Sequence, residues 1–202
     1  DDAAGSVGDG ASADHRGPAV DLGRVRSVVL TAPGGLVLGL SYHPAGSPLH
    51  DQALGWAGPA DRPLDHSYVS TSFRSSDSRP ALVTVPRPAP WAGRVPFYVH
   101  VPGEPDGFRI EADATGSDTA AGPQLVRVDG AAFAGVVVAD LDFAAALDDE
   151  PDRPVVLLAP DAANPIGRAA RTFADALHER GYLVDVYAPT GPGLLLGGFA
   201  GP

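Results

Sequence analysis

The sequence has no cysteine, no methionine and no lysine among its 202 residues. Without cysteine there can be no disulfide bond, no thiolate metal ligand and no cysteine nucleophile. Without lysine there can be no Schiff-base catalysis, which requires a lysine amine. No apolar stretch reaches the roughly 18–20 residues that span a bilayer, so we expect a soluble protein without membrane insertion.

Positive charge is also scarce. Fourteen arginines stand against 25 Asp and Glu residues, which gives a formal net charge of −11. A surface this acidic repels phosphate backbones and anionic membranes, so we expect no nucleic-acid partner. The hydrophobic content of 44% is enough for one core, and the length fits one domain.

The composition along the chain predicts one folded domain between two flexible ends. Residues 1–19 are small, polar and acidic, which is typical of a mobile arm. We expect a single α/β domain over 20–191 and a flexible tail over 192–202. Within the domain, residues 43–66 are rich in Pro, Gly, His and Asp and predict a long surface loop.

The first half of the domain has the pattern of β-structure. Residues 25–42 contain two β-rich runs around Pro33-Gly34-Gly35, which predicts a hairpin. Residues 67–73 and 81–85 predict two further strands. The proline-rich stretch 86–94 should run extended across a surface, with Trp91 as its anchor.

The second half predicts parallel strands joined by helices. Continuous apolar runs predict buried strands at 95–101 and 154–160, and further strands are expected at 124–128 and 182–189. Residues 108–113 alternate, as an edge or half-exposed strand would. Helical spacing predicts one or two short helices within 130–150 and a helix from Ile166 that Gly181 ends. The predicted fold is α/β, with a mainly parallel sheet that is flanked by helices and covered on both faces, and with an N-terminal β-hairpin addition.

Ligands in such sheets gather at the carboxyl ends of the strands, where a few titratable residues stand. His100 could act as a base, but a lone histidine is more often hydrogen-bonded within the sheet. Asp161 could be a general base, and capping or loop solvation is the interpretation we favour. Glu104 and Asp106 could bind a cation, but the spacing of two carboxylates favours a solvated turn.

Other motifs do not carry a reaction. Ser41 lacks the G-x-S-x-G elbow of a hydrolase nucleophile. The glycines at 34, 35 and 39 belong to a hairpin and form no phosphate loop. The His-Asp pairs at 50–51 and 65–66 lack metal-ligand spacing, so we expect neither a metal nor a cofactor.

Four blocks, in order, carry a family resemblance: "PAPWAGRVPFYVHVPGEPDGF", "VDGAAFA", "RPVVLLAPDAA" and "TFADALHERGYLVDVYAPTG". Over residues 86–191 the chain resembles the caspase-like cysteine peptidase domains, called lonely-Cys domains, of very large bacterial polymorphic-toxin-type proteins. In that pattern, the first strand ends in a His-Gly step. The second strand ends in the nucleophilic cysteine.

Both catalytic positions of the pattern are replaced in this chain. Gly103 matches the glycine of the His-Gly step, but Pro102 stands at the histidine position. Ala159 matches the residue before the nucleophile, but Pro160 stands at the cysteine position. A proline side chain can neither attack a carbonyl nor carry a proton.

The resemblance therefore implies a catalytically inactive peptidase-like domain. It would be a structural or interaction module of a larger secreted or cell-surface bacterial protein, with partners among other domains of that polypeptide or another protein. The vestigial dyad positions would be Pro102 and Pro160, with His100, Gly103, Asp106 and Asp161 at the rim of the former cleft. This interpretation requires residues 102 and 160 to lie at neighbouring strand ends. The alternative is an active hydrolase whose non-cysteine nucleophile, such as a serine, lies within about 3.5 Å of His100.

Overall fold

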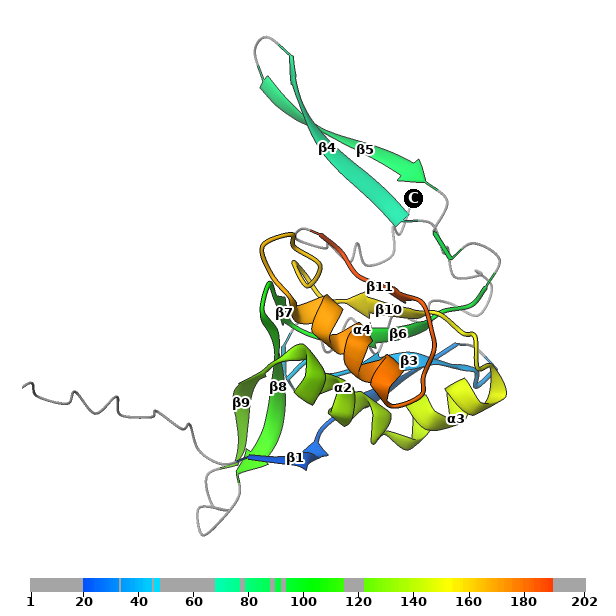
Figure 1. The fold of residues 1–202 in the computed structure, drawn as a ribbon. Helices are drawn as coiled ribbons and strands as arrows, with labels where there is room; N and C mark the ends of the chain where they lie inside the picture. Colours follow the sequence, from blue (N-terminus) through cyan, green and yellow to red (C-terminus); the bar gives the residue numbers. More distant parts are fainter. Residues whose placement is uncertain are drawn as a thin grey trace, which may run out of the picture.

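The computed structural model gives a mixed α/β structure, drawn in Figure 1. It describes residues 20–32, 34–44, 46–47, 68–76, 79–87, 90–91, 94–114 and 122–190. The predicted arm, the predicted tail and most of the predicted loop at 43–66 lie outside the described residues.

The largest sheet has five strands in the order β11-β10-β6-β3-β2. β10 lies between β11 and β6, β6 also pairs with β3, and these three pairings are all parallel. β2 and β3 pair antiparallel, which confirms the predicted N-terminal hairpin. The strands are β2 (Val28–Thr31), β3 (Val37–Ser41), β6 (Phe97–His100), β10 (Val155–Leu158) and β11 (Val186–Tyr187).

The predicted strand at 182–189 is wrong in extent, because only Val186 and Tyr187 pair with β10. The connection from β10 to β11 nevertheless contains a helix and joins parallel neighbours, as the sequence predicts. The sheet is therefore mainly parallel, with an antiparallel edge.

Three helices lie in the second half of the described chain: α2 (Gly130–Val138), α3 (Leu141–Asp149) and α4 (Ala169–Glu179). The carboxylates of Asp129 and Asp140 accept hydrogen bonds from the first turns of α2 and α3, so two short helices form where one or two were expected.

The predicted start of the last helix is wrong. Ile166 lies in a turn before α4 and is 86% exposed, although its spacing places it on the apolar stripe. The apolar stripe begins instead at Ala169 and continues through Phe173 and Leu177, which are buried. At the other end, Gly181 has a φ of +92° and its N–H donates to the carbonyl of His178, which confirms the predicted cap.

A second, antiparallel sheet contains β1 (Val20–Val25), β7 (Gly103–Glu104), β8 (Gly107–Ala114) and β9 (Pro123–Val128). β8 bonds to β9 on one side and to β1 and β7 on the other, so of the two alternatives expected at 108–113 it is not an edge strand. Its half-exposed alternation is confirmed, since Phe108, Ile110 and Ala112 are buried.

β4 (Tyr68–Ser76) and β5 (Arg79–Arg87) form a two-stranded hairpin, where the sequence predicts two strands. Among the described strands they pair only with each other.

The core has two parts, one on each face of the five-stranded sheet. The larger includes residues of all three helices and the rings of Phe97, Phe108, Phe133, Phe143 and Phe173. Figure 1 shows α2, α3 and α4 together on one side of β6 and β10. Among the described residues, no helix covers the other face, which carries the second core cluster.

The smaller core cluster contains Leu30, Leu38, Tyr98 and Val156. Trp91 packs against it and lies 5.4 Å, ring to ring, from Tyr187. This contact agrees with the predicted anchoring role of Trp91.

Among the described residues, no single helix is long and apolar enough to cross a membrane. α2 and α3 reach the required length and composition only as a pair, with a bend of 77° between them. Phe133 and Val137 of α2 and Phe143 and Leu147 of α3 belong to the large core cluster.

Candidate functional site

Two neighbouring strands end side by side at the predicted site. β6 and β10 run parallel with His100 opposite Leu158. Beyond this pair, the N–H of Val101 donates to the carbonyl of Leu158 at 3.3 Å. Pro102 and Pro160 each stand two residues beyond this pair, so both follow neighbouring strand ends. The geometry that the sequence interpretation requires is therefore present.

Gly103 holds the two strand ends in direct contact. A Cβ atom at this position would lie 2.6 Å from the carbonyl oxygen of Pro160 and 2.8 Å from the Cβ of Ala159. Both distances are shorter than real Cβ contacts, so the approach of the two loops requires glycine. The space between the strand ends is filled by the backbone of the chain itself.

The loop after β6 is a tight hairpin. β7 pairs with β8 through Gly103 and Glu104, with Pro105 and Asp106 in the turn. Asp106 is exposed. The Glu104 carboxylate instead bonds two arginines of the adjacent strands: Oε1 lies 2.5 Å from Nε of Arg109, and Oε2 lies 3.1 Å from Nε of Arg127.

The prediction of a solvated turn therefore applies to Asp106 and not to Glu104. The described residues contain no group of three or more His, Cys, Asp and Glu that could hold a metal ion.

The loop after β10 is tied to this hairpin. The carbonyl of Pro105 accepts hydrogen bonds from the N–H groups of Arg168 (2.8 Å) and Ala169 (3.0 Å), at the start of α4. A Cβ at Gly167 would lie only 2.0 Å from the same carbonyl oxygen. The two rim loops thus share hydrogen bonds and close contacts.

Asp161 lies in the turn after β10 and has a φ of +56°, the one positive value of a non-glycine residue within the described parts of the chain. Its carbonyl accepts from the N–H of Asn164 at 3.0 Å. α4 starts only at Ala169, so Asp161 does not cap that helix. The structure assigns it a turn role, in line with the interpretation favoured from the sequence.

His100 meets a serine that is distant in the sequence. β3 and β6 are parallel with Ser41 opposite His100, and Ser41 Oγ lies 3.3 Å from His100 Nδ1. The ring of His43 stacks on that of His100 with 4.0 Å between centroids. A search among the sequence neighbours of His100 does not find this pair. Ser41 stands near the end of the predicted hairpin and His100 near the end of the predicted strand at 95–101, but the sequence does not show that these two strands are neighbours.

The pair is sealed inside the protein. The exposed fractions are 0% for Ser41 and 3% for His100. Burial and, secondarily, the nearby His43 lower the pKa of His100 from 6.5 to about 3. His100 is therefore neutral at neutral pH and a weak base. The pair joins β3 to β6 away from solvent.

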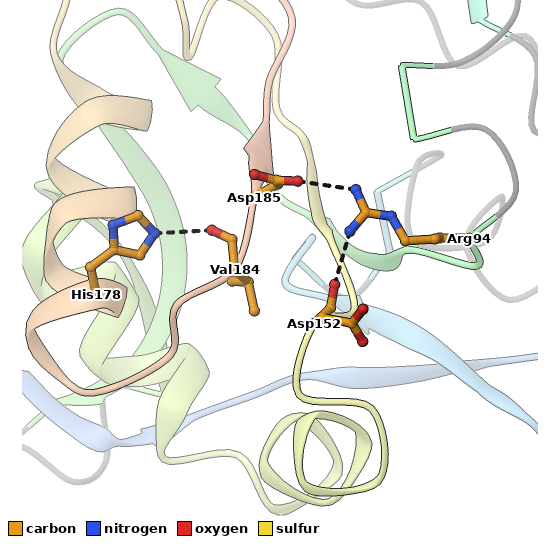
Figure 2. Close-up of polar contacts among 5 residues, drawn as sticks. All are labelled: Arg94, Asp152, His178, Val184 and Asp185. Carbon is orange, nitrogen blue, oxygen red and sulfur yellow. Dashed lines mark hydrogen bonds and ion pairs between the residues drawn. The ribbon is translucent and has the colours of Figure 1, made fainter.

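The opposite, amino end of the sheet is also held by polar contacts, shown in Figure 2. Arg94 donates to the Asp185 carboxylate (3.0 Å) and to the Asp152 carbonyl (3.1 Å). His178, at the end of α4, bonds the carbonyl of Val184 at 2.9 Å. These bonds join segments that are far apart in the sequence.

Arg153 is the buried charge of this end, with 5% of its surface exposed. Its guanidinium donates to three backbone carbonyls beside the starts of β3 and β6, those of Val37 (3.0 Å), Val95 (3.1 Å) and Pro96 (3.2 Å). It also lies 5.5 Å from the centroid of the Phe97 ring. The carbonyl dipoles replace the water that this charge loses on burial.

Comparisons with protein-family models, with curated proteins and with solved structures found no match to this chain.

Proposed function

We propose that this chain is a catalytically inactive peptidase-like domain of the caspase-like, lonely-Cys type. It serves as a structural or protein-interaction module of a larger secreted or cell-surface bacterial protein. The observation that carries the proposal is the position of Pro102 and Pro160 at two adjacent parallel strand ends. At these positions the resemblance calls for a histidine and a cysteine.

The chemistry of the two positions supports inactivity. A cysteine peptidase needs a thiolate to attack the scissile carbonyl and an imidazole to move the proton. The chain contains no cysteine anywhere, so no shift of register restores the nucleophile. The contacts of Gly103 with Pro160 and of Pro105 with α4 fill the rim, which favours a module that presents its surface over one with an open cleft.

The test is a cleavage assay of the purified protein with a mixture of unstructured peptides, read by mass spectrometry. We expect no peptide-bond cleavage. Matched variants with single changes in the loops 100–106 and 159–164, such as Asp106→Asn and Asp161→Asn, identify the source of any activity. Cleavage by the wild type that either change abolishes would refute the proposal.

A second candidate function is a serine-type hydrolase. The 3.3 Å approach of Ser41 Oγ to His100 Nδ1 favours it, since it meets the distance required for the alternative nucleophile. The burial of both side chains and the low pKa of His100 argue against it. A fluorophosphonate probe that reacts with activated serines decides between the two functions, with Ser41→Ala as the control. Labelling that disappears in this variant would replace the inactive-domain proposal.

A further inference from the structure

We propose that the β7–β8 hairpin is a charge-held strap across the carboxyl edge of the five-stranded sheet. In this device, the ion pairs of Glu104 keep the carbonyl of Pro105 on the first turn of α4. Anions that compete for the two arginines loosen the strap. The inference does not depend on peptidase ancestry, because each link is a contact within this chain.

The first link is a pair of arginines that lie directly opposite each other. Arg109 of β8 and Arg127 of β9 are register partners, and their side chains are 53% and 57% exposed. Like charges at opposite positions of an antiparallel pair repel each other. Glu104 bonds the Nε atoms of both, one with each carboxylate oxygen, and so offsets this repulsion.

The second link runs through the turn of the hairpin. Glu104 precedes Pro105, whose carbonyl accepts from the N–H groups of Arg168 and Ala169. α4 has no side-chain cap at its N-terminus. The carbonyl of Pro105 therefore satisfies two N–H groups at the start of α4 that have no partner within the helix.

The closed strap covers a defined part of the rim. Gly103, in the same hairpin, faces the carbonyl oxygen of Pro160, and Gly167 faces Pro105. Movement of the hairpin away from α4 would uncover Pro160 and leave the N–H groups of Arg168 and Ala169 for solvent. The ion pairs are partly exposed, so dissolved salt screens them.

Amide hydrogen exchange of the full chain, resolved by NMR, tests the strap. In Glu104→Gln, we expect the amides of Arg168 and Ala169 to exchange about three- to tenfold faster than in the wild type, a range set by the loss of two partly exposed ion pairs. Core amides such as that of Val99 should exchange unchanged. Asp106→Asn is the matched control, because Asp106 lies in the same hairpin without an ion pair and should leave all these rates unchanged.

Salt provides the second arm. Raising sodium chloride from 0.05 to about 0.5 M should accelerate exchange at Arg168 and Ala169 in the wild type and have little effect in Glu104→Gln. Equal rates at these two amides in Glu104→Gln and Asp106→Asn would overturn the proposal. It would also fail if Val99 accelerated as much as Ala169, since the change would then act on global stability and not on the strap.

Discussion

The two ends of the five-stranded sheet satisfy their buried polar groups in different ways. At the amino end, the charged guanidinium of Arg153 gathers three carbonyls. At the carboxyl end, Ser41 and His100 form a neutral side-chain pair, and the carbonyl of Pro105 joins the rim loops through backbone N–H groups. Among the described residues of the carboxyl end, no charged side chain is buried, and Pro102 and Pro160 follow the ends of β6 and β10.

The comparison shows that a buried polar cluster alone does not identify an active site. Ser41 and His100 have the residue types of a catalytic pair, yet both are sealed and the pKa of His100 is low. Arg153 is buried to a similar degree and donates to three backbone carbonyls. The predictions below perturb one end at a time, from the largest expected effect to the smallest.

Replacement of Arg153 should have the largest effect. Arg153→Met keeps a long apolar side chain but leaves three carbonyls without their donor, so we expect a loss of about 3–5 kcal/mol in the free energy of unfolding. Chemical denaturation measures it. The control is Arg94→Met, which removes an exposed arginine of the same end and should change the stability little. Similar losses in both variants would mean that burial of Arg153 is not what matters.

Closure of the rim by backbone contacts predicts a steric effect. Gly167→Ala adds a Cβ that would lie 2.0 Å from the carbonyl oxygen of Pro105, so we expect a loss of about 2–3 kcal/mol. Gly135→Ala is the matched control within α2, where the added Cβ meets only Arg180 Nη2 at 3.5 Å. There we expect a gain of about 0.5–1 kcal/mol, because alanine favours a helix. Thermal unfolding that ranks the two variants the other way would contradict the closed rim.

The carboxyl end should respond to acid through His100. Its pKa is near 3 in the folded protein and near 6.5 in the unfolded chain, so the unfolded chain binds the proton first as the pH falls. Stability is fully present above pH 6.5 and is lost between pH 6.5 and 3. The loss should approach about 1.4 kcal/mol per pH unit below 6.5, or about 2 kcal/mol by pH 5.

His100→Gln removes this titration while keeping a polar side chain. Denaturation curves from pH 7 to 5 should therefore fall less steeply in the variant than in the wild type. If the wild type and the variant lost stability equally steeply as the pH falls, His100 would not be buried in its neutral form.

The smallest effect is expected from Ser41. Ser41→Ala removes the 3.3 Å contact with His100 and should cost about 1 kcal/mol in the free energy of unfolding. Chemical denaturation of the variant and the wild type measures it. A stability of Ser41→Ala equal to that of the wild type would mean that the pair contributes nothing to the sheet.

Much of the fold is predictable from local patterns in the sequence. The apolar runs at β6 and β10 and the stripe of α4 locate the parallel core, and Pro33-Gly34-Gly35 locates the hairpin. The start of α4 is mispredicted because Ile166 continues the helical spacing, while the N–H groups after it bond the carbonyl of Pro105 across the rim. A tertiary contact decided that boundary.

The candidate site is predictable only in part, because strand order decides which residues meet. The neighbouring positions of Pro102 and Pro160 follow from matching strand ends. The contact between Ser41 and His100 joins residues 59 positions apart and depends on β3 lying beside β6. The two bonds of Glu104 depend on the pairing of β8 with β9, which local spacing does not reveal.

The most direct test of the central claim is a disulfide between the two proline positions. The chain has no cysteine of its own, so the double variant Pro102→Cys with Pro160→Cys contains only the two introduced thiols. Neighbouring strands of a sheet lie about 4.7–4.9 Å apart, which falls within the roughly 4.4–6.8 Å between Cα atoms that a disulfide requires. The control, Pro102→Cys with Leu183→Cys, pairs position 102 with an exposed residue at the amino end of the sheet.

After mild oxidation, thiol counting and mass spectrometry should show an intramolecular disulfide in the first double variant and two free thiols in the control. Two free thiols in both, in protein that remains folded, would contradict the claim that the two prolines occupy one vacated site.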